Sequence, residues 1–594
     1  MRIAIVDKKY CKHEKCQEEC VHVCPINRAG DKCVYIGENE KTGRPLSVID
    51  EGFCTGCGLC VKKCPFEAIM IVNTPEALKE EPIHRFGQNG FTLFRLPFPS
   101  QGVVGLLGPN GVGKTTALRI LSGEIKPNQG KEQAVNFAEF VTSFRGTELQ
   151  DYLERLEEGK LKAVVKPQMV DVLAGVEGTV EDLLEKFNER GKKDEIIKKL
   201  SLETVLKREL KNLSGGELQR VAIAVAVSRD ADIYYIDEPS SYLDVFQRLK
   251  VARLLRELSL EKEVMVVEHD LATLDLLADR IHIFYGIAGA YGIVTKNYST
   301  RVGINTFLDG YIKEDNVRMR KESLDFNKIR KDMEVSPVKV IEWGELKVDL
   351  GGFSLGVKSG SLRKGETLGI FGANALGKTT FAKILTGELK LGNSNKIGEV
   401  SGKITGEVRI SYKPQYISSM NEKVIDHLQK EIDIGWNDFV NEIITPLGIG
   451  RLMEADLNTL SGGELQRVEI AKCLGKEAEV YLLDEPSAYL DAEQRVIASK
   501  LIRKITERRE ASSMVIDHDL LFLSYISDRA LVFTGTSGVK GEAELIGLQE
   551  GFNKFLKEVG ITFRTDPQTK RPRANKPDSQ KDKDQRRDNV WFSI

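Results

Sequence analysis

The stretch Val103-Val-Gly-Leu-Leu-Gly-Pro-Asn-Gly-Val-Gly-Lys-Thr-Thr116 decides the fold. Its apolar start predicts a buried strand, a glycine-rich loop follows at once, and residues 117–122 have a helical pattern. In this strand–loop–helix context the glycines let backbone N–H groups surround phosphates, the lysine reaches the β- and γ-phosphates, and the first threonine offers a hydroxyl to Mg²⁺. We therefore predict an α/β fold with a phosphate-binding loop at residues 108–116.

This phosphate loop belongs to a unit that occurs twice. Residues 368–371 are a second apolar run, and Gly372-Ala-Asn-Ala-Leu-Gly-Lys-Thr-Thr380 follows it, with Ala375 where the first copy has Gly111. The octapeptide Leu-Ser-Gly-Gly-Glu-Leu-Gln-Arg is duplicated too, at 213–220 and 460–467. A Ser-Gly-Gly run at a helix start presents backbone N–H groups and a hydroxyl to an anion. The repetition indicates two phosphate-binding units with one plan.

Two carboxylates and a histidine also recur, each after an apolar run. They are Asp237, Glu238 and His269 in the first copy and Asp484, Glu485 and His518 in the second. Beside a P-loop, the aspartate suits the Mg²⁺ shell and the glutamate can polarise the attacking water. The chain has seven histidines in all, so two at equivalent positions favour a γ-phosphate contact over a place on the surface.

The spacing of the motifs reveals an insertion. The octapeptides lie 247 residues apart (213 to 460) and the P-loops 264 (108 to 372), so the first copy has 17 extra residues between these motifs. We place the surplus in a helix–loop–helix near 136–160, where Thr147 and Gln150 have capping-box spacing. An apolar stripe follows on the second helix, formed by Leu149, Tyr152, Leu153 and Leu156. The alternative is an ornamental surface hairpin.

Together these elements resemble the ATP-binding cassette (ABC) ATPases. The octapeptide matches the family's signature, Gln168 and Gln415 match its Q-loops, and the two histidines match its switch histidines. The resemblance implies two cassettes in tandem with Glu238, His269, Glu485 and His518 as catalytic residues. The implied nucleotide-binding residues are Asn110, Gly111, Gly113, Lys114, Thr115, Thr116, Gln168, Ser214, Gly215, Gly216, Glu217, Asp237, Asn374, Gly377, Lys378, Thr379, Thr380, Gln415, Ser461, Gly462, Gly463, Glu464 and Asp484. The implied Mg²⁺ ligands are Thr115, Gln168, Thr379 and Gln415.

In that family the cassettes face head to tail, so that each ATP lies between one P-loop and the other signature. The resemblance implies one site made by Lys114, Asp237, Glu238 and His269 with Ser461 and Gly463. It implies a second site made by Lys378, Asp484, Glu485 and His518 with Ser214 and Gly216. ATP then closes the pair and hydrolysis releases it. For an aromatic platform under adenine the candidates are Phe86, Phe91 and Phe353, with core packing as the alternative.

Nine of the ten cysteines precede residue 65. The run Cys54-x2-Cys57-x2-Cys60-x3-Cys64-Pro65 has the spacing with which bacterial ferredoxins bind [4Fe–4S] clusters. An earlier run, Cys11-x4-Cys16-x3-Cys20-x3-Cys24-Pro25, departs from that spacing but keeps four cysteines and the proline. We predict a small α+β, ferredoxin-like domain with two clusters, with zinc as the weaker alternative.

In two-cluster ferredoxins the last cysteine of each run ligates the other cluster. This rule assigns Cys24, Cys54, Cys57 and Cys60 to one cluster and Cys11, Cys16, Cys20 and Cys64 to the other. We interpret the remaining two, Cys33 and Cys473, as packing residues. Short apolar runs at 3–6, 34–36, 48–49 and 68–72 are expected to form small strands around the clusters.

The composition describes a soluble chain of several domains. It has 594 residues, 41% of them hydrophobic and 29% charged, with a net charge of −2. No run approaches the roughly 18 apolar residues of a membrane span, and the N-terminus turns polar early, so we expect a cytoplasmic protein. The expected domains are 1–75 (Fe–S), 76–300 (first cassette), 301–335 (hinge), 336–550 (second cassette) and 551–594 (C-terminal hinge and basic tail). Basic residues at 316–321 and 562–576 are solvated, pinned as hinges, or contacts to RNA phosphates.

A two-cluster head joined to twin cassettes resembles ABC subfamily E, the RNase L inhibitor family of ribosome recycling factors, in its archaeal type. The resemblance covers nearly the whole chain. It implies an ATP hydrolase whose closure swings the Fe–S domain and splits ribosomes after termination or rescue. The implied partners are the small ribosomal subunit, ribosomal RNA and a release factor or Pelota-type protein, with the chain acting as a monomer. The alternative is a protein in which ATP gates electron transfer from two [4Fe–4S] clusters.

Overall fold

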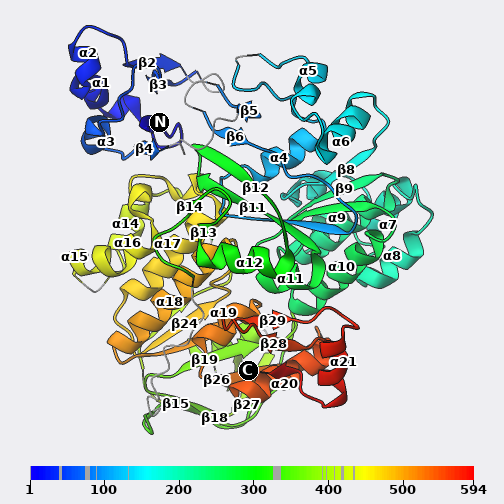
Figure 1. Cartoon of the computed structure of the whole chain (residues 1–594). Coiled ribbons are helices and arrows are strands. Elements are labelled where there is room, and N and C mark those ends of the chain that lie inside the picture. The colour runs from blue at the N-terminus through cyan, green and yellow to red at the C-terminus, as the bar shows by residue number, and fades with distance from the viewer. Residues whose placement is uncertain are drawn as a thin grey trace. The chain divides into compact units, whose positions relative to one another are not determined.

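The computed structural model describes residues 2–38, 43–73, 81–87, 90–131, 133–324, 336–390, 392–395, 398–406, 408–416, 420–432 and 435–593 (Figure 1). The expected domain boundary at 75/76 and positions 325–335 of the expected hinge lie outside these residues. The chain divides into two compact units. The first comprises Met1–Pro239, Leu254–His269 and Ala278–Ser323, and the second comprises Ser240–Arg253, Asp270–Leu277 and Leu324–Ile594.

The N-terminal region contains two short antiparallel ladders and three short helices. β1 (Arg2–Val6) pairs with β4 (Ile69–Asn73), and β2 (Val34–Glu38) pairs with β3 (Pro45–Ile49). The helices are α1 (Glu19–Val23), α2 (Pro25–Arg28) and α3 (Leu59–Lys63). All four expected strands are confirmed. Its apolar core is small, with Ala4, Val34 and Ile49 packed among cysteine side chains, so this region depends on whatever those cysteines hold.

The first cassette is built on an eight-stranded sheet in the order β5-β6-β12-β11-β7-β10-β9-β8. Its strands are β5 (His84–Arg85), β6 (Thr92–Phe94), β7 (Val103–Leu107), β8 (Ala163–Lys166), β9 (Ile233–Asp237), β10 (Glu263–Val267), β11 (Arg280–Ile287) and β12 (Tyr291–Ser299). The strands β11-β7-β10-β9-β8 pair in parallel. Every residue of β7 and β9 is buried, which is why these strands read as continuous apolar runs.

The second cassette repeats this core in a ten-stranded sheet in the order β20-β21-β16-β17-β27-β26-β19-β25-β24-β23. The strands are β16 (Leu346–Asp349), β17 (Ser354–Val357), β19 (Thr367–Phe371), β20 (Gly392–Asn395), β21 (Gly398–Ser401), β23 (Ile410–Lys413), β24 (Val480–Asp484), β25 (Ser512–Ile516), β26 (Arg529–Thr536) and β27 (Lys540–Gly547). The parallel order β26-β19-β25-β24-β23 matches β11-β7-β10-β9-β8 of the first cassette. The duplication predicted from the motifs is confirmed at the level of topology.

Helices connect the parallel strands in both cassettes, as in other α/β folds. The first cassette has α4 (Lys114–Leu121), α7 (Val180–Lys186), α8 (Lys193–Leu200), α9 (Gly215–Ser228), α10 (Val245–Leu258), α11 (Leu271–Leu277) and α12 (Thr300–Asp309). The second has α13 (Lys378–Leu385), α14 (Val424–Gln429), α15 (Trp436–Phe439), α16 (Thr445–Leu447), α17 (Gly462–Gly475), α18 (Ala492–Arg508), α19 (Leu520–Ile526) and α20 (Leu548–Val559). The hinge expected at 301–335 thus begins with most of a helix, α12.

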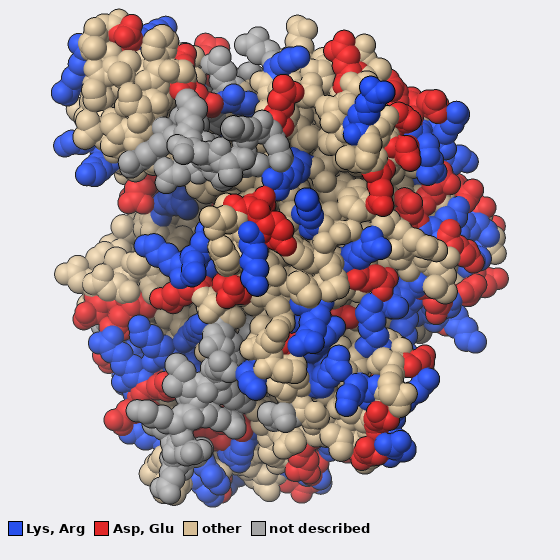
Figure 2. Space-filling model, in the orientation of Figure 1, with Lys and Arg blue, Asp and Glu red and all other residues tan. Residues whose placement is uncertain are grey.

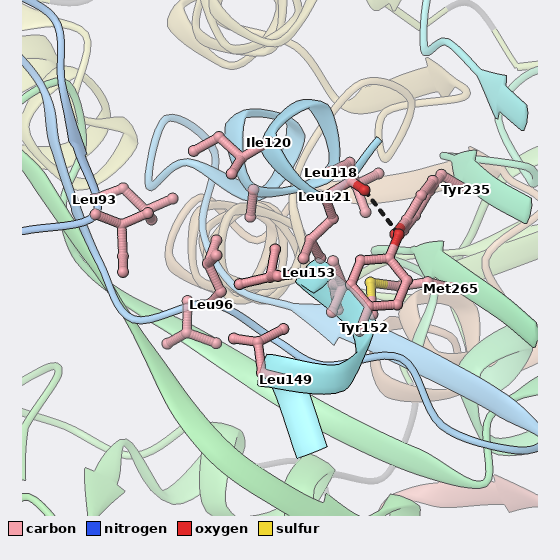
Figure 3. Close-up of a cluster of buried hydrophobic side chains, with 14 of the residues drawn as sticks. Leu93, Leu96, Leu118, Ile120, Leu121, Leu149, Tyr152, Leu153, Tyr235 and Met265 are labelled. Carbon is pink, nitrogen blue, oxygen red and sulfur yellow. Dashed lines mark hydrogen bonds between the residues drawn. The ribbon is translucent and has the colours of Figure 1, made fainter. Parts of the chain in front are cut away.

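The insertion of the first cassette forms the two expected helices, α5 (Phe137–Thr142) and α6 (Glu148–Glu157). Figure 3 shows Leu149, Tyr152 and Leu153 of α6 packed with Leu118 and Leu121 of α4 in one buried cluster. The alternative of an ornamental surface hairpin is therefore wrong. The insertion is part of the cassette core, directly behind the helix that starts at the P-loop.

The capping box expected at Thr147 and Gln150 is not formed. The Thr147 hydroxyl donates to the Phe144 carbonyl at 2.7 Å, and Gln150 Oε1 accepts from the Gly146 N–H at 2.9 Å. The turn from α5 into α6 brings Thr147 over the Phe144 carbonyl, so this local acceptor takes the hydroxyl that a capping box would use.

The C-terminal segment is ordered rather than a solvated basic tail. β28 (Phe563–Thr565), β29 (Pro572–Ala574) and β30 (Phe592–Ser593) form a small sheet beside α21 (Gln580–Arg587). Arg571 is fully buried, and its NH2 group donates to Asp275 Oδ1 of α11 at 3.2 Å. Arg573 Nε donates to the same oxygen at 3.0 Å. These two arginines are therefore paired within the second compact unit.

The charged surface is mixed. Figure 2 shows Lys and Arg interspersed with Asp and Glu over the face in view, in keeping with a net charge of −2. In the part of the chain that the structure describes, no helix is both long and apolar enough to cross a bilayer.

Candidate functional site

Each P-loop lies between the first strand of the parallel core and the helix that follows it. Gly113 and Gly377 precede α4 and α13 with φ of 92° and 95°, a conformation that glycine adopts without strain. Lys114 Nζ donates to the Gly108 carbonyl at 2.8 Å, and Lys378 Nζ donates to the Gly372 carbonyl at 3.0 Å. Both lysines are buried. The loop thus holds a positive charge at the helix N-terminus, where backbone N–H groups already favour phosphate.

The second P-loop differs from the first at Ala375. Its φ is 57°, and the equivalent Gly111 has a φ of 77°. The left-handed conformation expected from the glycine is therefore kept with an alanine, at some cost in backbone strain. The two loops share one backbone geometry with different residues at this position.

The P-loop threonine predicted as a Mg²⁺ ligand lies beside the aspartate at the end of β9 or β24 in both cassettes. Thr115 Oγ1 donates to Asp237 Oδ2 at 2.8 Å, and Thr379 Oγ1 donates to Asp484 Oδ2 at 2.8 Å. Burial raises the pKa of Asp237 to about 6 and also raises the pKa of Asp484. A hydroxyl beside a buried carboxylate is the oxygen-rich donor set that Mg²⁺ prefers. These residues therefore fit the ion.

A glutamate faces a glutamine and a histidine in each cassette. In the first, Glu238 Oε1 accepts from Gln168 Nε2 at 2.8 Å and lies 3.6 Å from His269 Nε2. In the second, the same two distances join Glu485 to Gln415 and His518. Burial raises the pKa of Glu485 to about 7 and lowers that of His518 well below its usual value. The predicted catalytic pairs and Q-loop residues thus come together as one constellation, built twice.

Both glutamates predicted as catalytic stand in left-handed backbone, with φ of 47° for Glu238 and 49° for Glu485. Non-glycine residues adopt this conformation only where the surroundings enforce it. The enforcement is visible in the neighbouring hydrogen bonds: Gln219 Nε2 donates to the Glu238 carbonyl at 2.7 Å, and Gln466 Nε2 donates to the Glu485 carbonyl at 2.6 Å. Sequence reasoning missed this role for the signature glutamines, although both stand in the quoted octapeptide.

A buried lysine in each cassette bonds the end of the strand that carries the predicted Mg²⁺ aspartate, β9 or β24. This contact was not predicted from the sequence. Lys166 Nζ donates to the Asp237 carbonyl at 2.9 Å, and Lys413 Nζ donates to the Asp484 carbonyl at 2.8 Å. Burial lowers the pKa of each of these lysines to about 8. They place a second positive charge beside the carboxylates and fix the strand end from which the carboxylates project.

The signature serines cap the helices that follow them. Ser214 and Glu217 form a capping box at the start of α9, and Ser461 and Glu464 form one at the start of α17. A Cβ on Gly463 would lie 2.7 Å from the Tyr489 carbonyl oxygen, so this position needs glycine. The glutamates predicted as nucleotide-binding serve as caps in the structure, each paired with the serine three residues before it.

The aromatic candidates separate by position. Phe91 lies against the first P-loop, where a Cβ on Gly113 would be 2.6 Å from its Cζ, and Phe353 lies at the same place beside Gly377, at 3.1 Å. Phe86 instead makes an edge contact with His84. The symmetry favours Phe91 and Phe353 over Phe86 as supports for a base.

The cysteines line two cavities in the grouping that the crossed rule predicts. One is lined by Cys24, Cys54, Cys57 and Cys60. The other is lined by Cys11, Cys16, Cys20 and Cys64. Within the described residues no three His, Cys, Asp or Glu side chains are placed to hold a single metal ion. Four thiols around a cavity fit a larger group such as an iron–sulfur cluster.

The two remaining cysteines are buried, as expected for packing residues. Cys33 lines the first cavity as a fifth thiol and is held by Asn27, whose Oδ1 accepts from the Cys33 N–H at 2.9 Å. Cys473 lies in α17 beside Ser411, and burial raises the pKa of its thiol to about 11.

Family models match the chain in the regions that hold these sites. The ABC transporter model matches residues 94–241 and 356–488, the 4Fe-4S binding domain matches 47–70, and a possible Fer4-like domain of RNase L inhibitor matches 1–32. ABC transporter E family member 1 of Arabidopsis thaliana is 44% identical over 607 residues, which cover 100% of this chain and 99% of the relative. The chain belongs to the ABC transporter E family.

Solved structures of E-family proteins agree. The ABCE1 chain in a model of ribosome-bound archaeal Pelota and ABCE1 has a TM-score of 0.91 and 48% identity, covering 100% of this chain and 99% of that one. The ABCE1 chain in a crystal structure of the complex of archaeal ribosomal stalk protein aP1 and archaeal ribosome recycling factor aABCE1 has a TM-score of 0.81 and 47% identity, covering 87% and 100%. As an E-family member the chain carries two ATP-binding cassettes of the ABC ATPase kind and an iron–sulfur-binding N-terminal region.

Proposed function

We propose that this chain is an ATP hydrolase that recycles ribosomes. ATP-dependent closure of its two cassettes moves the Fe–S domain and splits ribosomes into subunits after termination or rescue. The observation that carries the proposal is the duplicated glutamine–glutamate–histidine constellation behind each P-loop, joined to a head with two cysteine-lined cavities. Support comes from the two similar solved structures, which contain an archaeal ribosome recycling factor and a ribosome-bound ABCE1.

The hydrolytic step follows from the residues behind each P-loop. Lys114 places its charge where the β- and γ-phosphates bind, and the Glu238 carboxylate accepts the proton of the attacking water. His269, whose Nε2 lies 3.6 Å from that carboxylate, would contact the γ-phosphate. Thr115, Asp237 and Gln168 would hold Mg²⁺, and the ion would neutralise charge that develops on the phosphates. In the second cassette the equivalent roles fall to Lys378, Glu485, His518, Thr379, Asp484 and Gln415.

Composite sites convert this chemistry into motion. In the proposed arrangement Ser461 and Gly463 complete the site of Lys114, while Ser214 and Gly216 complete the site of Lys378. A γ-phosphate held by both cassettes favours the closed state, and a ligand shifts an equilibrium only by such a difference in affinity. Hydrolysis removes the bridging phosphate and releases the pair.

The cysteine-lined cavities hold two [4Fe–4S] clusters in this proposal. Cys24, Cys54, Cys57 and Cys60 would ligate one, and Cys11, Cys16, Cys20 and Cys64 the other. Each cluster cross-links segments far apart in sequence, which stiffens a region whose apolar core is small. The clusters therefore act as mechanical parts, and electron transfer gated by ATP is the competing role.

The proposed partners are the small ribosomal subunit with its RNA, and a release factor or Pelota-type protein. The chain would act in the cytoplasm as a monomer whose cassettes form an intramolecular dimer. Co-sedimentation with ribosomal subunits tests this directly. We expect the chain to pellet with small subunits when a non-hydrolysable ATP analogue is present and to stay in the supernatant without nucleotide. Binding that ignores the nucleotide, or no binding in either case, would contradict the proposal.

A further inference from the structure

An arginine on α18 makes two contacts that the hydrolytic mechanism does not use. Arg495 Nε donates to the Leu490 carbonyl at 2.9 Å, and its NH1 group donates to Asp519 Oδ2 at 2.8 Å. The Arg495 side chain is 14% exposed and that of Asp519 is 7% exposed. Leu490 lies in the loop that follows the catalytic Glu485, and Asp519 immediately follows the switch histidine. One side chain therefore ties together the two segments that carry the catalytic pair.

The first cassette makes the same two contacts. Arg248 Nε donates to the Leu243 carbonyl at 2.8 Å, and its NH1 group pairs with Asp270 Oδ2. Asp270 follows His269 as Asp519 follows His518. The two cassettes differ at other positions around the switch, for instance Glu268 against Asp517. The doubly bonded arginine is nevertheless kept in both.

The position of His518 depends on these two contacts of Arg495. His518 Nε2 lies 3.6 Å from Glu485 Oε1. On the N-terminal side of the histidine, Asp517 Oδ1 accepts from the Ser487 hydroxyl at 2.6 Å. On its C-terminal side, Asp519 is held by Arg495. The histidine is thus fastened at both flanks to the loop that runs from Glu485 to α18.

We propose that Arg248 and Arg495 are positioning residues for ATP hydrolysis, because each holds the switch histidine of its own cassette in line with the catalytic glutamate. This inference rests on the proposed ATPase activity. Each arginine acts as a clamp across two backbone segments, and the planar guanidinium is suited to it because its donors lie in a fixed fork. A lysine has a single ammonium on a flexible stem and reaches one of the two acceptors at a time.

The clamp is separable from helix stability. Asp519 Oδ1 caps α19 by accepting from the Phe522 N–H at 3.0 Å, and Asp270 Oδ1 caps α11 by accepting from the Thr273 N–H at 2.8 Å. Asparagine caps a helix about as well as aspartate. Replacing each arginine by Met and each aspartate by Asn therefore removes the ion pair, keeps the caps and leaves no buried charge unpaired.

The test compares four full-length chains with the wild type. The clamp variant carries Arg248→Met, Asp270→Asn, Arg495→Met and Asp519→Asn. The second carries Arg248→Met and Arg495→Met alone, and the third carries Arg248→Lys and Arg495→Lys. The control, Arg503→Met, removes another arginine of α18. Its Nε pairs with Glu507 at 2.8 Å and its NH1 group donates to the Tyr525 carbonyl at 3.4 Å, so it makes neither contact of the clamp. For each we measure the melting temperature, ATP affinity, and kcat and KM for ATP.

We expect the clamp variant to melt near the wild-type temperature, to keep its KM, and to lose about tenfold or more in kcat, since small misplacements at a reacting centre are costly. The lysine variant should fall between the two, and Arg503→Met should match the wild type. The inference is overturned if the clamp variant has both the kcat and the melting temperature of the wild type, because the arginines would then serve stability alone. A wild-type chain that does not hydrolyse ATP would instead refute the proposed function.

Discussion

Glu238 and Glu485 are the residues on which the hydrolytic account depends. Each accepts a hydrogen bond from a Q-loop glutamine and faces a switch histidine. Glu→Gln keeps the shape of the side chain but removes the base. We expect the double variant Glu238→Gln/Glu485→Gln to bind ATP normally and to lose about 100-fold or more in kcat, within the range for general-base catalysis.

Phosphate release and filter binding of ATP would measure the two effects separately. The exposed Glu550 of α20 offers a matched control, because Glu550→Gln makes the same change far from either P-loop in the sequence. Full hydrolysis by the double variant would remove these glutamates from the catalytic role.

His427 makes the second cassette sensitive to pH. It lies buried in α14, with Nε2 2.8 Å from Glu469 Oε1 of α17 and Nδ1 2.6 Å from Glu422 Oε1. The hydrogen bond to Glu469 and then that to Glu422 raise the pKa of His427. The structurally equivalent positions of the first cassette are Leu183, Ala222 and Gly178, because Thr179 and Lys423 stand at matching places before α7 and α14. The first cassette therefore has no histidine at this contact with its signature helix.

The sign of the pH effect follows from linkage. A histidine whose pKa is raised on folding contributes stability that is fully present below its unfolded pKa of about 6.5 and is lost as the pH rises through the folded value. We expect hydrogen exchange in peptides that cover 424–429 and 462–475 to accelerate more steeply with rising pH in the wild type than in His427→Gln, after correction for the intrinsic rate. Equal pH dependence in both proteins would contradict this assignment.

The residues that touch phosphate and Mg²⁺ could be predicted because their chemistry fixes both residue type and spacing. Lys166 and Gln219 could not, although Gln219 stands in the signature octapeptide and Lys166 lies two residues before Gln168. Their acceptors are the backbone carbonyls of Asp237 and Glu238, and no sequence pattern marks a carbonyl. The sequence alone also does not distinguish a capping role of Glu217 and Glu464 from a nucleotide contact.

Among the helices and strands, hydrogen bonds join the insertion of the first cassette to its nucleotide-binding core. The Tyr152 hydroxyl of α6 donates to the Leu121 carbonyl of α4 at 2.7 Å and accepts from the Tyr235 hydroxyl of β9 (Figure 3). α4 begins at Lys114, and Asp237 ends β9. In the second cassette, which lacks the insertion, Leu482 stands in place of Tyr235. The Tyr235 hydroxyl is thus present in the cassette that has α6, and the equivalent position of the other cassette has no hydroxyl.

Tyr152→Phe should loosen this contact without opening a cavity. It removes the donor to Leu121 and the acceptor of Tyr235, which costs about 1–3 kcal/mol for buried groups left unpaired. We expect faster hydrogen exchange in peptides that cover 114–122 and 147–157. Tyr235→Phe leaves the bond from Tyr152 to Leu121 intact and should have a smaller effect. Larger loss with Tyr235→Phe would reverse the proposed direction of the bonds.

The pairing of α11 with the C-terminal segment is a second link between distant elements. Arg571 and Asp275 are both fully inaccessible to solvent, and Arg573 shares the same carboxylate. Asp275→Asn leaves a buried guanidinium without its counter-charge and should destabilise the segment by about 3–5 kcal/mol. Limited proteolysis should then cut within 560–593. Asp588→Asn removes an exposed carboxylate in the same segment and should leave the cleavage pattern unchanged.

Helices and strands could be predicted where the sequence has a hydrophobic period or a motif spacing. The second helix of the insertion was expected from the apolar stripe of Leu149, Tyr152, Leu153 and Leu156. The capping box failed because Thr147 had a nearer acceptor in Phe144. The sequence left the C-terminal basic segment open between a solvated run, a pinned hinge and an RNA contact. The buried partner that decides for a pinned arrangement, Asp275, cannot be recognised from the sequence.

For the whole molecule, the central inference is that two cassettes with one topology are chemically unequal. The first has the insertion, while the second has Ala375 in its P-loop and His427 behind its signature helix. Identical signature octapeptides therefore stand in different surroundings. Such inequality lets one ATP site differ from the other in turnover, which suits a machine that must close and reopen in sequence.

The measurement that tests the central claim most directly is ribosome splitting on a sucrose gradient. Archaeal ribosomes would be incubated with a Pelota-type protein, ATP and either the wild-type chain or the Glu238→Gln/Glu485→Gln variant, with a chain lacking all eight cluster cysteines as a further comparison. We expect free subunits with the wild type and intact ribosomes with the cysteine-free chain. Ribosomes that stay intact with the wild type, while reduction of the clusters changes its ATP turnover, would contradict the central claim.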